Sequence, residues 1–182
     1  MPHPAAKAKK PTLDYKAPFV ALDFETADRG SDSACALALM RVEGLEIVER
    51  RVCLLRPPRQ YFLFTYVHGI AWKHVKDAPT FAEVWPTLRP MLDGVAFLAA
   101  HNAGFDRRVL EACCAVAKLP APPHPYLCTV QLSRRTWALK SHKLPDVCAH
   151  LGVALKHHDA GSDAEACARI VIAAARAPAK PV

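Results

Sequence analysis

Two acidic residues, Asp23 and Glu25, stand at the end of a short apolar run that spans residues 19–24. If the run is a strand, both carboxylates lie on one of its faces, about 7 Å apart along the chain. Two close carboxylates repel each other, and burial of an unpaired charge is costly, so a bound cation would offset both costs. The alternative is a solvated strand end with two surface acids. The pair therefore indicates a metal site only if other acids join it.

A second segment whose side chains could take part in catalysis has the sequence His101-Asn102-Ala103-Gly104-Phe105-Asp106 and follows another apolar run. Asn102 can cap turn amides, Gly104 permits a tight backbone, and Asp106 falls in the first turn of a predicted helix. An acid at that position is also favoured by the helix dipole alone. The segment is thus consistent with either a metal ligand or ordinary helix capping.

A third segment places His158 five residues before Asp163, an acid that begins the last predicted helix. Each alone has an ordinary explanation, as a surface histidine and as an acid matched to the helix dipole. The four acids Asp23, Glu25, Asp106 and Asp163 all stand where a predicted element ends or begins. Such positions can converge at one edge of a sheet.

Four carboxylates without nitrogen or sulfur ligands select hard divalent ions, so we expect Mg²⁺ or Mn²⁺. Four negative charges match two such ions, and paired ions about 4 Å apart are the arrangement that hydrolyses phosphodiesters. A neighbouring histidine can take a proton from the attacking water at neutral pH. The chemistry that these residues predict is metal-dependent phosphodiester hydrolysis.

The elements that must position these residues follow from apolar spacing and turn signals. Strands are predicted at residues 19–24, 34–42, 47–55, 95–100 and 126–130, with a tight hairpin at residues 43–46. Helices are predicted at residues 80–92, 105–119, 144–151 and 163–175. Three strands joined by hairpins, followed by alternating helix and strand, predict an α/β fold with a mixed sheet and helices on its faces.

The motifs Asp23-Phe24-Glu25-Thr26, His101 to Asp106, and His158-x₄-Asp163 resemble, in order and spacing, the three exonuclease motifs of the DEDDh branch of the DEDD superfamily. This branch is also called DnaQ-like, after the proofreading epsilon subunit of bacterial DNA polymerase III. The resemblance covers residues 19–176. It implies a ribonuclease H-like fold, with a mixed five-stranded sheet flanked by helices on both faces, and a 3′→5′ exonuclease that releases nucleoside 5′-monophosphates.

The resemblance also implies roles for particular residues. Asp23 would bridge two divalent metal ions, Glu25 and Asp163 would complete the site of the ion that holds the attacking water, and Asp106 would serve the other, partly through water. His158 would be the general base, because the neighbouring His157 has the wrong spacing to Asp163. The residues expected to meet the substrate are Phe24, Thr26, His101 and Asn102.

Three functions remain open on this sequence. The leading hypothesis is an exonuclease that acts on the 3′ ends of single-stranded DNA, and the second is an exoribonuclease like RNase T or oligoribonuclease. DNA and RNA are not separated, because recognition of a 2′-hydroxyl depends on pocket geometry. The third is an inactive domain that binds nucleic acid or a polymerase, and the presence of all four acids and the histidine counts against it.

A basic cluster precedes the helix predicted at residues 144–151. It either contacts backbone phosphates or forms a solvated charged loop. The epsilon subunits carry a C-terminal extension that binds the polymerase, and this chain ends just after its last helix. We therefore expect at most a weak polymerase association. The cluster consists of Arg134, Arg135, Lys140, His142 and Lys143.

Length, charge and cysteine content agree with this reading. The 182 residues suit one domain and carry a net charge of +7, which suits an anionic partner such as nucleic acid. We expect a flexible basic tail at residues 1–17, the exonuclease domain at residues 18–177 and a second tail at residues 178–182.

The seven cysteines are odd in number and lack zinc-site spacing. No apolar stretch is long enough to span a membrane, and no secretory signal is recognisable, so a cytoplasmic protein is expected.

Overall fold

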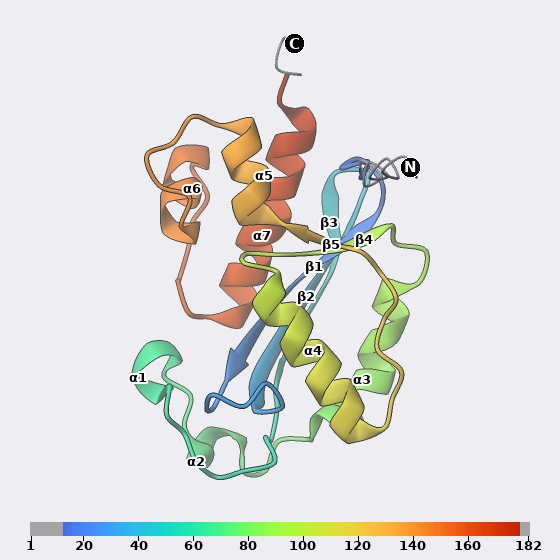
Figure 1. Cartoon of the computed structure of the whole chain (residues 1–182), viewed down its shortest axis with the longest axis vertical. Coiled ribbons are helices and arrows are strands. Elements are labelled where there is room, and N and C mark those ends of the chain that lie inside the picture. The colour runs from blue at the N-terminus through green and yellow to red at the C-terminus, as the bar shows by residue number, and fades with distance from the viewer. Residues whose placement is uncertain (1–12, 179–182) are drawn as a thin grey trace, which may run out of the picture.

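A five-stranded mixed sheet forms the centre of the computed structural model, which describes residues 13–178 (Figure 1). The strand order is β3-β2-β1-β4-β5. The first three strands are antiparallel neighbours, whereas β4 runs parallel to β1, and β5 runs parallel to β4. The bounds are β1 (Phe19–Thr26), β2 (Ala34–Glu43), β3 (Glu46–Leu54), β4 (Phe97–Ala100) and β5 (Tyr126–Cys128). The predicted mixed sheet is confirmed.

β1 lies in the middle of the sheet and is buried on both faces, which explains why its sequence is an apolar run rather than an alternating one. Phe19 and Ala21 point into a first core, and Val20, Leu22 and Phe24 point into a second one. By the same alternation, Asp23 and Glu25 lie on the face of the first core.

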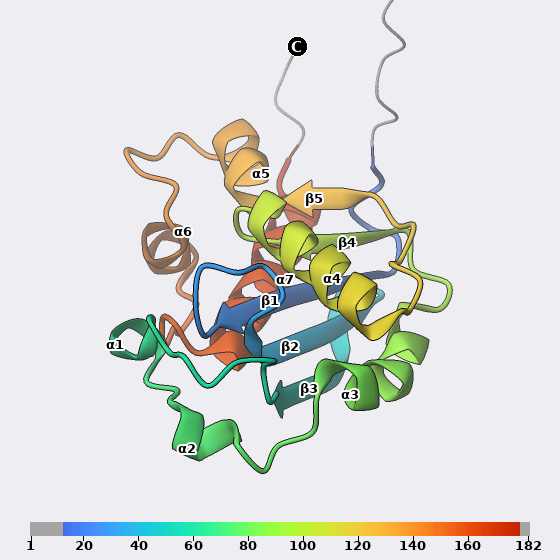
Figure 2. The same ribbon diagram turned by 60° about the horizontal axis from the view of Figure 1, so that its bottom comes forward.

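Helices cover both faces of the sheet, as predicted. The first core lies under α5 (Thr129–Thr136), α6 (Leu144–Leu151) and α7 (Ala160–Arg176). The second lies under α3 (Phe81–Leu88), the 3₁₀ helix Arg89–Leu92 and α4 (Gly104–Ala117). Figure 2 shows α4 in front of β1 and β4, with α7 behind them.

Some predicted element bounds were wrong. The strand predicted to continue to residue 130 ends at Cys128, and α5 begins at Thr129. No apolar repeat marks α5, because of its three buried residues only Leu132 is apolar. The helices α1 (Thr65–His68) and α2 (Trp72–Val75) were also missed, since four residues are too few for a periodic pattern.

The predicted tails lie mostly outside the described residues, namely at 1–12 and 179–182. In the described part of the N-terminal segment, Leu13 and Tyr15 pack against the first core. Within residues 13–178, no helix has the length and apolar character needed to cross a membrane.

Candidate active site

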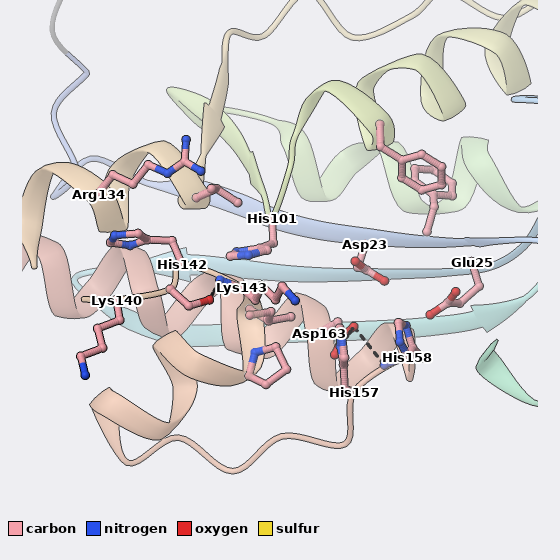
Figure 3. Close-up of a pocket in the computed structure, with 16 residues that line it drawn as sticks. Asp23, Glu25, His101, Arg134, Lys140, His142, Lys143, His157, His158 and Asp163 are labelled. Atoms are coloured by element: carbon pink, nitrogen blue, oxygen red, sulfur yellow. Dashed lines mark hydrogen bonds and ion pairs between the residues drawn. The ribbon is translucent and has the colours of Figure 1, made fainter. Parts of the chain in front are cut away.

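Three carboxylates meet where the end of β1 faces the start of α7. Asp23 and Glu25 come from β1 and Asp163 comes from the first turn of α7, and their ligand oxygens lie within 4.8 Å of one another (Figure 3). The helix begins where it does because the Asp159 side chain accepts a hydrogen bond from the amide of Ser162, at 3.1 Å. The structure thus brings together three of the four acids that the sequence singled out.

The three acids are largely shielded from water. Glu25 is 9% exposed and Asp163 is 4% exposed. Burial, followed by the charges of Asp106, Asp163 and Glu25, raises the pKa of Asp23 well above its ordinary value. Burial and the Asp163 charge raise the pKa of Glu25 to about 7. The site therefore concentrates acidic groups whose ionisation is opposed by burial and by their mutual repulsion.

This group of carboxylates fits a hard divalent cation. The Oδ1 atom of Asp163 is buried and has no hydrogen-bond partner among the described residues. A buried, unpartnered carboxylate oxygen is costly unless a ligand satisfies it. Oxygen ligands of this kind suit Mg²⁺ and Mn²⁺. A cation would also offset burial and mutual repulsion, the two causes that raise these pKa values.

Asp106 occupies a different position from the other three acids. It is buried at the start of α4 and accepts a hydrogen bond from the amide of Phe24, at 3.2 Å. It lies outside the group of three, yet its charge raises the pKa of Asp23, so the two carboxylates are neighbours. The Phe24 amide, which the resemblance implies for substrate contact, is thus engaged by Asp106 in this structure.

Both histidines of the third motif are organised by the Oδ2 atom of Asp163. The Nδ1 atom of His157 lies 3.0 Å from it, and the main-chain amide of His158 donates to it at 3.1 Å. The two rings stack, with centroids 3.8 Å apart. The backbone of His158 has a φ of 66°, which is uncommon for a residue other than glycine. Figure 3 places the His158 ring on the side of Glu25.

The residues expected to contact the substrate separate into two groups. Phe24 and His101 line the same pocket as the acids, whereas Asn102 and Thr26 do not. Asn102 is exposed in a left-handed turn with φ 67°, and Thr26 lies on the opposite strand face from Glu25. Burial lowers the pKa of His101 to about 4, so its ring is neutral at neutral pH.

One further residue at this edge had only a weak sequence signal. The Nε2 atom of His68 lies 3.1 Å from the carbonyl oxygen of Thr26, and its Nδ1 atom accepts the amide of Ile70 at 3.0 Å. These partners fix a neutral ring with the proton on Nε2. His68 therefore holds the end of β1, a role that depends on a contact 42 residues away in the chain.

The pocket, of about 940 Å³, extends from the acids to a basic side. Four of the five residues of the predicted basic cluster line it, namely Arg134, Lys140, His142 and Lys143. Arg135 does not line it, although it is the neighbour of Arg134 in α5. One pocket thus joins an acidic end and a basic end.

The raised pKa of Glu25 makes metal-free stability depend on pH. The folded protein holds this proton up to about pH 7, whereas the unfolded chain releases it near 4.5, so the ionised carboxylate destabilises the fold as the pH rises between these values. Relative to wild type, we expect Glu25→Gln in EDTA to be more stable by about 3 kcal/mol at pH 8 and to lose this advantage near pH 4.5. Denaturant unfolding at both pH values measures it. An equal advantage at the two pH values would contradict the assignment.

A family model described as an exonuclease domain, RNase T, matches residues 20–171, which is most of the chain. The chain belongs to the DEDDh exonuclease family. Among solved structures, this DEDDh exonuclease resembles exonuclease X in complex with 5′ overhanging duplex DNA. The match has 27% identity and a TM-score of 0.69, and covers 86% of this chain and 90% of that one.

The likeness to a second solved structure supports only the fold of this chain. The nuclease domain of 3′hExo, a DEDDh family member bound to rAMP, has a TM-score of 0.74 and 19% identity, and the match covers 89% of this exonuclease and 93% of that chain. The ribonuclease H-like fold implied by the motifs is confirmed.

Curated relatives are similar in sequence. A PolC-type DNA polymerase III of Thermotoga maritima is 29% identical over 160 residues, which are 86% of this exonuclease and 12% of that protein. Exodeoxyribonuclease 10 of Escherichia coli K12 is 30% identical over 105 residues, which are 54% of this chain and 42% of that protein. This exonuclease therefore spans about an eighth of the PolC-type relative and less than half of the second one.

Proposed function

We propose that this DEDDh exonuclease hydrolyses single-stranded DNA in the 3′→5′ direction and releases nucleoside 5′-monophosphates with two divalent ions, Mg²⁺ or Mn²⁺. The observation that carries the proposal is the group formed by half-buried Asp23 with buried Glu25 and Asp163, in which one oxygen of Asp163 has no partner among the described residues. Clustered carboxylates serve phosphodiester hydrolysis by binding the divalent cations that carry out the reaction.

Each residue has a part in the proposed mechanism. Asp23, Glu25, Asp163 and Asp106 would hold the ions, which would stabilise charge on the scissile phosphate and make the attacking water more acidic. His158 accepts the proton of that water at its imidazole. The main-chain amide of His158 donates a hydrogen bond to the Asp163 carboxylate. This contact fixes the backbone of His158 and keeps its ring beside the acids.

DNA is favoured over RNA as the substrate because the curated relatives are DNA polymerases and an exodeoxyribonuclease. The 3′hExo structure bound to rAMP motivates the exoribonuclease alternative, although that likeness is one of fold. An inactive binding domain is disfavoured because it would need neither the acids nor the histidine. A weak polymerase association is a further proposal, motivated by the PolC-type relatives.

We also propose a cytoplasmic location. All seven cysteines are free thiols, and five of them are buried. Unpaired cysteines are typical of a reducing compartment.

Activity is expected to require an added divalent ion, and Mn²⁺ should support it at least as well as Mg²⁺. The same ions should raise the melting temperature, because they bind the folded state and relieve repulsion among the acids. The test is digestion of 5′-labelled single-stranded DNA, duplex DNA and RNA side by side in Mg²⁺, Mn²⁺ or EDTA. Shortening from the 3′ end, fastest on single-stranded DNA, is expected.

Two results would overturn parts of the proposal. Full activity in EDTA after metal stripping would exclude the metal-dependent mechanism. Faster digestion of RNA than of DNA would favour the exoribonuclease alternative.

A further inference from the structure

The basic side of the pocket consists of cations without carboxylate partners. Arg134 comes from α5, and Lys140 and Lys143 come from the segment between α5 and α6. Within residues 13–178, none of the three has a carboxylate oxygen within 4.0 Å. By contrast, Arg59 pairs with both Asp28 and Asp32. The pocket cations therefore remain free to bind an external anion.

The segment that carries the two lysines is held in place by buried contacts. Trp137 and Leu139 pack against the first core, and the Trp137 ring lies edge-on to His150, with centroids 5.9 Å apart. The Nδ1 atom of His142 lies 2.9 Å from the hydroxyl of Ser133, which is fully buried. Side chains that anchor the segment alternate with exposed cations. We call Arg134, Lys140 and Lys143 the basic arm.

Arg134 and Lys140 of the basic arm lie at the opposite end of the pocket from Glu25 and His158, whereas Lys143 lies closer to the acids, on the side of Asp163. Figure 3 shows Asp23 between the two ends. A ligand that fills the pocket would thus meet a cleavage site and a separate anion-binding site. At about 940 Å³, the pocket is at the upper limit of ordinary small-molecule sites.

We propose that the basic arm binds phosphates of the substrate strand on the 5′ side of the scissile bond. This inference rests on the proposed 3′→5′ activity. The terminal nucleotide of a 3′ end has no phosphate beyond the scissile one, so every further phosphate of the strand lies upstream. A second anion site in the same pocket can only meet those upstream phosphates.

The proposal makes the substrate a strand of several nucleotides rather than a dinucleotide. Lysine and arginine contacts to phosphates are independent of base sequence, and they weaken as salt displaces them. Affinity should therefore rise with strand length until the upstream phosphates reach the basic arm. Removal of the arm should abolish this gain and leave the cleavage site intact.

The test compares the double variant Arg134→Gln/Lys140→Gln, which removes the two cations farthest from the acids, with Arg135→Gln, a matched control that loses a cation just outside the pocket. Affinity for labelled oligothymidylates of two to twenty nucleotides is measured by fluorescence anisotropy in Ca²⁺ at several salt concentrations. For the 20-mer, the double variant should bind about tenfold more weakly, and the slope of log K against log salt should become shallower by about 1.4. The control should match wild type.

Turnover in Mn²⁺ provides the second measurement. The double variant should show a raised KM and an unchanged kcat on the 20-mer. It should hydrolyse the p-nitrophenyl ester of thymidine 5′-monophosphate as wild type does, because this ester has no upstream phosphate. Circular dichroism and melting curves show whether each variant is folded.

The outcomes separate this inference from the proposed function. If the double variant binds the 20-mer as tightly as Arg135→Gln does, or if it loses activity on the small ester, the inference is wrong. If wild type hydrolyses neither substrate, the proposed function fails, and the anisotropy series still decides whether the basic arm binds the strand.

Discussion

Asp23→Asn is expected to lower turnover by about 10³-fold or more while the protein remains folded. Asp23 is the acid whose pKa is raised by the charges of all three other site acids, which places it at the centre of the site. Metal ions at phosphoryl-transfer sites contribute several kcal/mol of charge stabilisation, and each 1.36 kcal/mol corresponds to tenfold in rate. Turnover of labelled single-stranded DNA in saturating Mn²⁺ measures the loss.

The stability of the same variant gives an independent result. Removal of the Asp23 charge relieves repulsion with Asp106, Asp163 and Glu25, so the metal-free variant should melt above wild type. Added Mn²⁺ should then stabilise it less than it stabilises wild type. Asp77→Asn is the control, because that side chain is 88% exposed and does not line the pocket, and it should behave as wild type does. Near-normal turnover of Asp23→Asn would show that these acids are structural.

His158→Asn is expected to lower kcat by about 10²–10⁴-fold, the usual contribution of a positioned general base. Asparagine suits this position because it tolerates the left-handed backbone that His158 adopts, with φ 66°, and its amide is not a general base at neutral pH. Metal binding and strand binding should be largely retained, because the four carboxylates and the basic arm are unchanged. Single-turnover rates at saturating Mn²⁺, together with anisotropy in Ca²⁺, separate these effects.

His157→Asn is the matched control for the general base. His157 contacts Asp163 and stacks on His158, so its loss should affect the site geometry and cost far less rate than the loss of His158. A large loss for His157→Asn with almost none for His158→Asn would reverse the assignment of the two histidines. Equal, additive losses would indicate that both rings act on the attacking water.

Much of the fold followed from local patterns. The period of two in β1 placed Asp23 and Glu25 on one face, and the structure confirms it through their shared group with Asp163. The helix α5 was not predicted at all, because its buried surface is mostly polar and an apolar repeat is absent. Element existence was therefore predictable wherever a chain segment buries an apolar face, and element ends were less so.

The sequence by itself singled out the candidate catalytic residues, because residue type and short spacing suffice to recognise the three motifs. Only the tertiary structure decided how these residues meet. The Phe24 amide engages Asp106 from 82 residues away, and His68 holds Thr26 from 42 residues away. The structure also put Arg134 inside the pocket and Arg135 outside it. Such contacts depend on how separate elements pack across the sheet, and the chemical character of one segment does not specify which distant segment it will face.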